Sequence, residues 1–419
     1  MRSVANFYGV RSVTTKLCAE LDPEDCGLQA MPDVSPPKWH LGHTTWFFET
    51  FVLEPFASGY QAFSLHYRHI FNSYYEGVGA RHPRALRGIL SRPLLSEVVR
   101  YRGHVDHAIA SALATLPARA EQLIELGLHH EQQHQELLVM DATYNFSVNP
   151  LAPAFSSRPL ARSEAPAPLR FVPFDGGLTS IGHDSSGGFA FDNETPRHRH
   201  FLEPFAFASR LVTNGEYLAF IQDGGYQKSA LWLSDGVDWV RANAVDAPLY
   251  WRARDGVWFQ FTAHGEVPLD PNAPVCHVSA YEALAYAEWA KARLPTEFEW
   301  ELAATSTPES IDARAPDPMA AQGVAPQFHP RSSSATSGID QLFGELWQWT
   351  RSAYEPYPGF EVAAGAVGEY NGKFMCNQWV LRGSSFATPE RHSRTTYRNF
   401  FQPDRRWPFT GIRLARSAR

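Results

Sequence analysis

The chain has 419 residues, of which 44% are hydrophobic and 13% aromatic, and its formal net charge is -7. This length favours two domains, and the composition is typical of a well-packed globular protein. The negative charge and the lack of Lys/Arg runs argue against nucleic acid or an anionic membrane as a partner. No apolar stretch approaches the roughly 20 residues needed to cross a bilayer, and no signal peptide is recognised. The 4 cysteines lack CxxC spacing, so we expect a reduced, cytoplasmic protein.

Residues 1–150 are expected to form a helical bundle. The segments 38–56, 92–114 and 118–146 carry apolar residues at helical spacing, and a further helix is expected near the N-terminus. Long helices in this number predict an up-and-down bundle. The Pro-, Ala- and Ser-rich stretch that follows predicts a linker over 151–170.

Residues 171–419 have a different character, with short apolar strands between Gly, Pro, Asn and Asp turns. Helices are expected only at 213–222, capped by Thr213 or Asn214, at 279–292, starting at Ser279, and at 296–304. This pattern predicts an irregular α+β domain, so the fold class of the whole chain is α+β with two domains.

The segment HHEQQHQELL, residues 129–138, concentrates imidazole and carboxylate on one predicted helix. His130 and His134 are four positions apart, so they lie on one face of a helix and suit a single metal ion. Glu131 gives a superficial match to the HExxH motif of zinc proteases, which alone produces many false matches. Glu136 lies about 200° around the helix from His134 and is not expected to bind the same ion.

A second cluster places His40 and His43 three positions apart on the helix expected at 38–56. Two facing helices of a bundle could therefore supply three histidines to one ion and leave positions open for substrate and oxygen. Such a set suits Fe(II), and zinc stays open on ligand type alone. The plainer alternative is that these are surface or interhelical histidines without a metal.

Several longer motifs occur along nearly the whole chain. They are SPPKWHLGHTTWFFE (35–49), FNSYYEGVGARHPRALRG (71–88), HHEQQHQELL (129–138), RLPTEFEWELAA (293–304), LFGELWQWTRSAY (342–354), VLRGSSFA (380–387) and FTGIRLAR (409–416). In combination they resemble the EgtB-type sulfoxide synthases (hercynine oxygenases) of ergothioneine biosynthesis. The resemblance implies a DinB-like four-helix bundle carrying the iron ligands, fused to a formylglycine-generating-enzyme-like domain of C-type-lectin-like fold that completes the substrate pocket.

The resemblance also implies the cofactor and the reaction. Fe(II) would be held by His43, His130 and His134, the residues that match the family's ligand motifs. The substrates would be hercynine, O2 and a thiol such as cysteine or gamma-glutamylcysteine, which are joined at imidazole C2 as a sulfoxide. Three histidines leave three octahedral positions for these three ligands.

Further site residues follow from the same resemblance. Tyr74 and Tyr75 would be catalytic, since a phenol near the metal can give a proton or an electron. The residues expected to bind substrate are Arg84 and Arg87 for the thiol's carboxylate, Gln133 for the hercynine imidazole, and Tyr397, Asn399, Phe400 and Phe401 for its trimethylammonium and carboxylate groups. The plainer alternatives are packing for the tyrosines and aromatic residues and a surface salt bridge for Arg87.

The chain differs from the families that it resembles at informative positions. No cysteine occurs in GSSFATPERHSRTTYR after Arg382, which excludes the thiol chemistry of formylglycine generation. Ser384 replaces the second glycine of the family's RGGS segment, and Phe386 follows Ser385, which leaves the sulfur-side substrate open. The related selenoneine synthases, which join hercynine to a selenosugar, are one alternative. A non-catalytic metal- or ligand-binding protein is another, while an ovothiol-type synthase is disfavoured because no methyltransferase domain is found.

Overall fold

The computed structural model describes residues 4–185, 187–307, 328–389 and 391–418. The chain forms two compact units, which are Met1–Ser156 with Val362–Tyr370, and Ser157–Glu361 with Asn371–Arg419. The first unit is helical and the second contains both helices and sheets, which confirms the expected α+β class. None of the helices in the described ranges has the length and apolar character needed to span a membrane.

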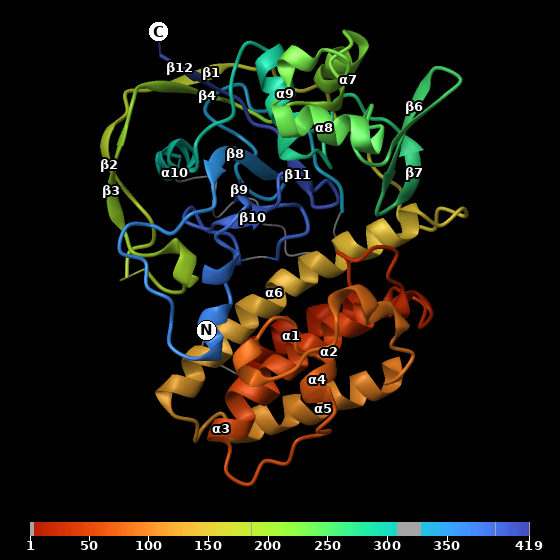
Figure 1. Ribbon diagram of the computed structural model, residues 1–419, viewed down its shortest axis with the longest axis vertical. Coiled ribbons are helices and arrows are strands. Elements are labelled where there is room, and N and C mark those ends of the chain that lie inside the picture. Colours follow the sequence, from red (N-terminus) through yellow and green to blue (C-terminus); the bar gives the residue numbers. More distant parts are fainter. Residues whose placement is uncertain (1–3, 186, 308–327, 390, 419) are drawn as a thin grey trace. The chain divides into compact units, whose positions relative to one another are not determined.

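The first unit is built around a bundle of long helices (Figure 1). These helices are α1 (Val4–Ala19), α2 (Pro37–Phe48), α5 (Leu95–Ala112) and α6 (Ala118–Ser147). Helix α1 packs against α6, and α2 packs against both α5 and α6. The shorter elements are η1 (Asp25–Gly27), the π-helical turn η2 (Glu49–Leu53), α3 (Glu54–Phe56), α4 (Tyr67–Ile70), η3 (Glu76–Val78), η4 (Arg84–Ile89) and η7 (Ala366–Glu369). The helices expected from apolar spacing are confirmed.

Glu131 on α6 is the buried electrostatic link between the helices of the bundle. Its carboxylate accepts hydrogen bonds from Arg11 Nη1 at 2.8 Å and Thr14 Oγ1 at 2.6 Å, both on α1, and pairs with Arg102 of α5. Burial alone would raise the pKa of Glu131, but Arg102 and Arg11 lower it to about 2. The carboxylate is therefore ionised and fixes the rotation of α6 relative to α1 and α5.

The second unit consists of small sheets with helices packed around them (Figure 1). The sheet orders are β1-β4-β12, β10-β9-β8-β11, β2-β3 and β5-β6-β7, and of the described pairs β11 with β8 is parallel. The strands are β1 (Phe171–Phe174), β2 (Gly177–Ile181), β3 (His198–Leu202), β4 (Phe205–Ala208), β5 (Trp251–Arg254), β6 (Val257–Thr262), β7 (Gly265–Pro268), β8 (Trp347–Ala353), β9 (Trp379–Gly383), β10 (Asn399–Phe401), β11 (Thr410–Gly411) and β12 (Ala415–Ser417).

Longer and shorter helices join these strands. They are η5 (Asp192–Glu194), α7 (Asn214–Gln222), η6 (Ser229–Leu231), α8 (Ser234–Asn243), α9 (Ala280–Trp289), α10 (Glu297–Thr305) and η8 (Gly372–Phe374). The side chains of Thr213 and Ser279 cap α7 and α9, which confirms the expected starts of both helices. Helix α8 was not expected from the sequence.

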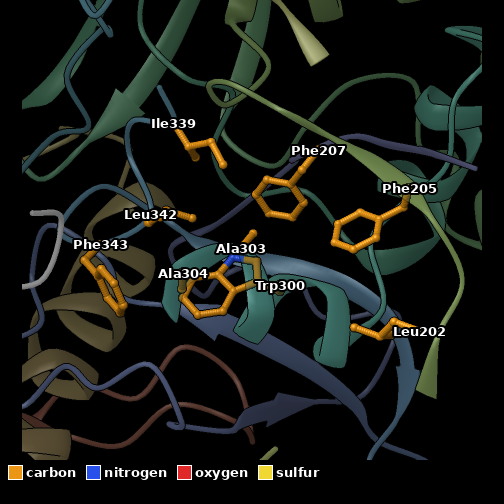
Figure 2. Packing of buried hydrophobic residues seen from close by; sticks show 9 residues of the cluster. All are labelled: Leu202, Phe205, Phe207, Trp300, Ala303, Ala304, Ile339, Leu342 and Phe343. Atoms are coloured by element: carbon orange, nitrogen blue, oxygen red, sulfur yellow. The ribbon is translucent and has the colours of Figure 1, made fainter. Parts of the chain in front are cut away.

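The core of the second unit surrounds α10. Trp300 of α10 is fully buried and lies near Phe205 and Phe207 of β4 and near Leu342 (Figure 2). Its indole nitrogen donates to Gln348 Oε1 of β8 at 2.7 Å, so the one polar atom of this large side chain is satisfied inside the core.

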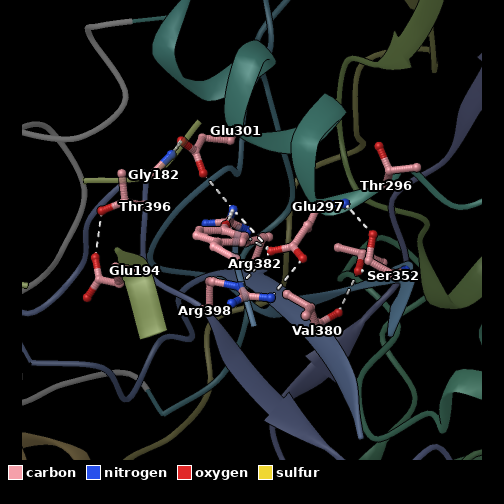
Figure 3. A network of polar contacts seen from close by, with 12 residues as sticks. Gly182, Glu194, Thr296, Glu297, Glu301, Ser352, Val380, Arg382, Thr396 and Arg398 are labelled. Carbon is pink, nitrogen blue, oxygen red and sulfur yellow. Dashed lines mark hydrogen bonds and ion pairs between the residues drawn. The ribbon is translucent and has the colours of Figure 1, made fainter. Parts of the chain in front are cut away.

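Two buried arginines tie α10 to neighbouring strands (Figure 3). Arg382 of β9 donates to Glu301 at 2.6 Å, and Arg398 donates to both oxygens of Glu297 at 2.8 and 3.0 Å. A bidentate arginine–carboxylate pair fixes geometry as well as distance. Because Arg398 directly precedes β10, it fixes the strand that carries the predicted hercynine contacts.

The Glu131 network yields a stability prediction. Replacing Glu131 with Gln leaves two buried arginines without their shared carboxylate, so the free energy of unfolding should fall by roughly 3–5 kcal/mol. Urea denaturation followed by circular dichroism measures the change. Glu125→Gln on the same helix is the control, since Glu125 has no hydrogen bond or ion pair among the described residues, and equal stability of both variants would contradict the account.

Candidate metal centre

Three buried histidines of the first unit meet at one point. The ligand atoms of His43 on α2 and of His130 and His134 on α6 all lie within 4.8 Å of one another. The ring centroids are 5.0 Å apart for His43 and His130, 4.9 Å for His43 and His134, and 4.6 Å for His130 and His134. This is the one such cluster found among the described residues. The i,i+4 pair and one residue of the second histidine cluster are thus brought together.

The ring of His43 is held on three sides. Trp39 stacks on it at 4.5 Å with an interplanar angle of 13°, and Trp46 lies on it at 5.6 Å and 15°. The Nδ1 atom of His43 is 2.6 Å from the carbonyl oxygen of Phe71, to which it donates. Its Nε2 atom is buried and has no hydrogen-bond partner. The imidazole is therefore fixed with one free lone pair directed inward.

The three histidines are neutral, which is the form in which an imidazole can bind a metal. Burial lowers the pKa of His130 to about 3 and holds the pKa values of His43 and His134 well below their ordinary range. Both ring nitrogens of His130 are buried without a hydrogen-bond partner. Each unsatisfied buried polar group costs about 1–3 kcal/mol, so neighbouring lone pairs of this kind fit a bound cation. Imidazole nitrogens suit Fe(II) and Zn(II).

The ligand atoms that converge in the cluster belong to the three histidines, and neither Glu131 nor Glu136 contributes one. Glu131, which gave the HExxH-like match, points away from the cluster toward α1 and α5, where both its oxygens are engaged by arginine and threonine. A role as the general base of a zinc protease is thereby excluded for Glu131.

Tyr74 and Tyr75 lie in a loop that Asn72 holds in place. The Asn72 side chain accepts from the Tyr75 amide at 3.2 Å and donates to the Tyr75 carbonyl at 3.1 Å. Tyr75 is fully buried, and its ring is 5.5 Å from that of Trp46, which in turn covers His43. Tyr74 stacks on Tyr75 at 4.9 Å. Burial raises the pKa of both phenols, so both are protonated at neutral pH.

Arg87 is a buried cation next to the centre, whereas Arg84 lies at the surface. Arg87 lies 3.3 Å above the ring of Trp39, and it donates to the hydroxyls of Ser35 at 2.9 Å and Ser73 at 3.0 Å. Among the described residues it has no carboxylate partner within ion-pair distance, and burial followed by the charge of Arg84 lowers its pKa. The exposed Arg84 donates to the carbonyl of Asp33. The charge of Asp141 partly offsets this lowering of the pKa, but no carboxylate of the described residues contacts the guanidinium, which therefore suits an anion.

Tyr370 is a residue of this site that the sequence reasoning missed. It belongs to the segment 362–370, which joins the first unit although its flanking residues belong to the second. Its hydroxyl donates to Gln133 Oε1, and its ring lies 5.5 Å from His130 and 6.1 Å from Tyr74. The preceding Glu369 accepts from the amides of Glu76 at 3.0 Å and Gly77 at 2.8 Å. These bonds fasten the segment to the loop that follows Tyr74 and Tyr75.

The other predicted hercynine contacts belong to the second unit. Tyr397 is only 4% exposed and lies against Trp347 at 5.2 Å, so it packs inside that unit. The remaining three are half-buried on β10, where the Asn399 side chain accepts from the Phe400 amide at 2.8 Å, Phe400 stacks on Tyr354 at 4.1 Å, and Phe401 contacts Trp407 at 5.8 Å.

The two residues that differ from the family's RGGS segment, Ser384 and Phe386, are buried in the interior of the second unit. Ser384 is fully buried and accepts from the Gly344 amide at 2.8 Å. Phe386 is 5% exposed and lies 4.4 Å from the ring of Phe409. Both substitutions therefore have a packing explanation within their own unit.

Comparisons with known proteins agree with this organisation. Residues 6–138 match the DinB superfamily, and residues 159–418 match the sulfatase-modifying factor enzyme 1-like domain. The chain is 32% identical to hercynine oxygenase from Mycobacterium tuberculosis over 97% of this chain and 96% of the relative. It is 31% identical to hercynine oxygenase from Mycolicibacterium smegmatis over 99% and 98%. Ergothioneine biosynthesis protein 1 from Schizosaccharomyces pombe is 30% identical over 55% of this chain and 28% of the relative.

The cluster of His43, His130 and His134, called the triad below, yields a prediction about metal content. His134→Ala removes one of three converging ligands, so the purified protein should lose most of its bound Fe(II) after anaerobic loading. Elemental analysis of the desalted protein measures the stoichiometry. His129→Ala, next to the triad in sequence, should keep the full metal content, and a fully loaded His134→Ala variant would show that the ligand assignment is wrong.

Proposed function

The chain belongs to the hercynine oxygenase family, and on this premise we propose that it catalyses the O2-dependent joining of hercynine to a thiol. The carbon–sulfur bond would form at C2 of the hercynine imidazole. One oxygen atom of O2 would become the sulfoxide oxygen, and the other would leave as water with the hydrogens of the C2–H and S–H bonds. The observation that carries the proposal is the buried cluster of three neutral imidazoles in a family member of matching length.

The metal would be Fe(II), held by His43, His130 and His134. When bound, iron supplies coordination of the substrates and activation of dioxygen. Three imidazole ligands would leave positions for those substrates. The stacking of Trp39 and Trp46 on His43 would keep the ligand oriented during turnover and exclude water from that side.

Arg87 would hold the carboxylate of the sulfur donor. Among the described residues, its buried guanidinium contacts two hydroxyls and an aromatic ring, so a carboxylate would complete its electrostatic environment. This favours a carboxylate-bearing thiol such as cysteine or gamma-glutamylcysteine over the selenosugar of the selenoneine branch. Ser384 and Phe386 do not favour the selenosugar, because both side chains are explained by packing inside the second unit. Arg84, at the surface, could contribute only after releasing Asp33.

The tyrosine hydroxyls near the triad would donate and accept protons during the reaction. Tyr370 touches Gln133 and His130, so its hydroxyl would orient the Gln133 amide toward the hercynine imidazole and hold a proton beside the reacting atoms. Tyr74 lies next to Tyr370 and would give Tyr370 a new proton after Tyr370 has donated its own. Tyr75 is packed deeper, against Phe51 and Trp46, and would mainly hold Tyr74 in place.

Oxygen consumption tests the function directly. The Fe(II)-loaded protein should consume O2 with hercynine and cysteine or gamma-glutamylcysteine, and mass spectrometry should show the hercynyl sulfoxide. A selenosugar in place of the thiol should give a slower reaction. Tight iron binding without O2 uptake in any combination would instead identify a non-catalytic metal-binding protein.

Substitution of Arg87 should separate the two substrates. Arg87→Gln removes a charged hydrogen-bonding partner, so the KM for cysteine should rise about 10- to 100-fold while the KM for hercynine stays nearly constant. Cysteamine, which lacks the carboxylate, should be affected much less. The exposed Arg68→Gln is the control, and an equal rise for both substrates would argue against a role in thiol binding.

Removal of single phenol hydroxyls should change the product. In Tyr370→Phe and Tyr74→Phe the proton donor is lost, so we expect oxidation of the thiol to increase at the expense of carbon–sulfur bond formation. The ratio of the two products, measured by mass spectrometry, reports this. Tyr8→Phe, at an exposed position of α1, should leave the ratio unchanged. An unaltered ratio in both site variants would remove the phenols from the mechanism.

A further inference from the structure

A chain of hydrogen bonds runs from a buried carboxylate to one of the three histidines. The Nδ1 atoms of His40 and His134 are 2.8 Å apart, and His40 Nε2 lies 3.1 Å from Asp141 Oδ2. The same carboxylate oxygen accepts from the amide of Ser35 at 2.8 Å. His40 and Asp141 are both 2% exposed. Asp141 follows His134 by two turns of α6, so the two residues lie on the same face of the helix.

The direction of these bonds follows from what each atom can donate. Asp141 Oδ2 already accepts from a backbone amide, so it acts as an acceptor for His40 as well, and the proton of His40 lies on Nε2. His40 Nδ1 then carries a lone pair and must accept a proton from its neighbour. His134 is therefore protonated on Nδ1, and its free lone pair lies on Nε2. The reverse direction would place a proton on His134 Nε2 and block that atom as a ligand.

We propose that Asp141 and His40 are positioning residues that hold His134 in the tautomer whose Nε2 atom can bind the metal. The inference rests on the proposed function insofar as that function requires a metal at the triad. Neither residue touches substrate or metal in this account, since both act through His134. The role differs from that of Glu131 and Glu136, which lie outside this hydrogen-bond chain.

His43 provides an internal comparison. Its Nδ1–H donates to the backbone carbonyl of Phe71, which likewise leaves Nε2 as the ligand atom. The fold therefore fixes the tautomer of two histidines in two ways, one through the backbone and one through side chains. Only the side-chain route through His40 can be removed by a substitution. Loss of such a partner of a ligating histidine typically weakens metal binding by about 10- to 100-fold.

A pair of substitutions at His40 separates hydrogen bonding from packing. His40→Phe keeps an aromatic ring of similar size but offers no acceptor to His134. His40→Asn fills less space, but its amide oxygen stands near the position of Nδ1 and can accept the His134 proton. A packing role predicts that Phe is the better replacement, whereas the positioning role predicts that Asn is better.

The dissociation constant for Co(II) is the readout, measured on the full chain by visible absorption without any substrate. We expect His40→Phe to weaken Co(II) binding by about 10- to 100-fold and His40→Asn to recover most of the loss. The inference is overturned if His40→Phe binds Co(II) as tightly as the unsubstituted chain, or if His40→Asn binds no better than His40→Phe. Circular dichroism and thermal unfolding of the metal-free proteins establish that each variant is folded.

A second measurement needs no folded variant at His40. In protein with 15N-labelled histidine rings, the nitrogen chemical shifts of the metal-free chain report each tautomer directly. We expect a proton on Nδ1 of His134, whose signals are those missing from the spectrum of His134→Gln. A proton on Nε2 of His134 overturns the inference.

These outcomes are distinct from those that test the proposed reaction. Co(II) binding that depends on His40 as expected, together with no O2 uptake from hercynine and thiol, would leave the positioning role standing and remove the reaction. Normal turnover together with a Co(II) affinity that does not depend on His40 would support the reaction and remove the positioning role. Failure of the unsubstituted chain to bind Co(II) would contradict both.

Discussion

The ion pair of Glu131 with Arg11 and Arg102 determines what the rest of the first unit can do. It lies on one side of α6, and the side chains of His130 and His134 project from another. Because a buried carboxylate between two arginines is costly to displace, it fixes the rotation of α6 in the bundle. That rotation places the two imidazoles against His43 of α2. An ion pair outside the histidine cluster therefore sets the geometry of the candidate metal centre.

The residues around the three histidines each have a different role in the candidate site. The tryptophans of α2 orient His43, and Arg87 brings a positive charge that no carboxylate among the described residues contacts directly. The segment 362–370 adds Tyr370, which reaches Gln133. A hydrophobic bundle would not need so many buried polar groups, and bound ligands would offset the cost of those without a partner, such as the ring nitrogens of His130. This is the physical basis for assigning an enzymatic role to the first unit.

The sequence allowed much of this to be predicted, and the exceptions have physical reasons. Helical periodicity located α2, α5 and α6, and side-chain capping located α7 and α9, because these are local signals. The convergence of His43 with His130 and His134 was expected from the family resemblance and from the i,i+4 spacing. Tyr370 could not be found in this way, because its partner Gln133 is far away along the chain and no local pattern links the two. Glu131 was first noticed for a catalytic motif, and its partners on α1 and α5 are equally distant in sequence.

X-ray absorption at the iron edge of the anaerobic Fe(II)-loaded protein is the most direct test of the central claim, that the buried imidazoles form an iron site open to substrate. The account predicts scattering from three imidazoles in the protein alone and from an additional imidazole once hercynine is added. An iron environment of oxygen ligands without imidazole scattering, or one that hercynine leaves unchanged, would contradict it.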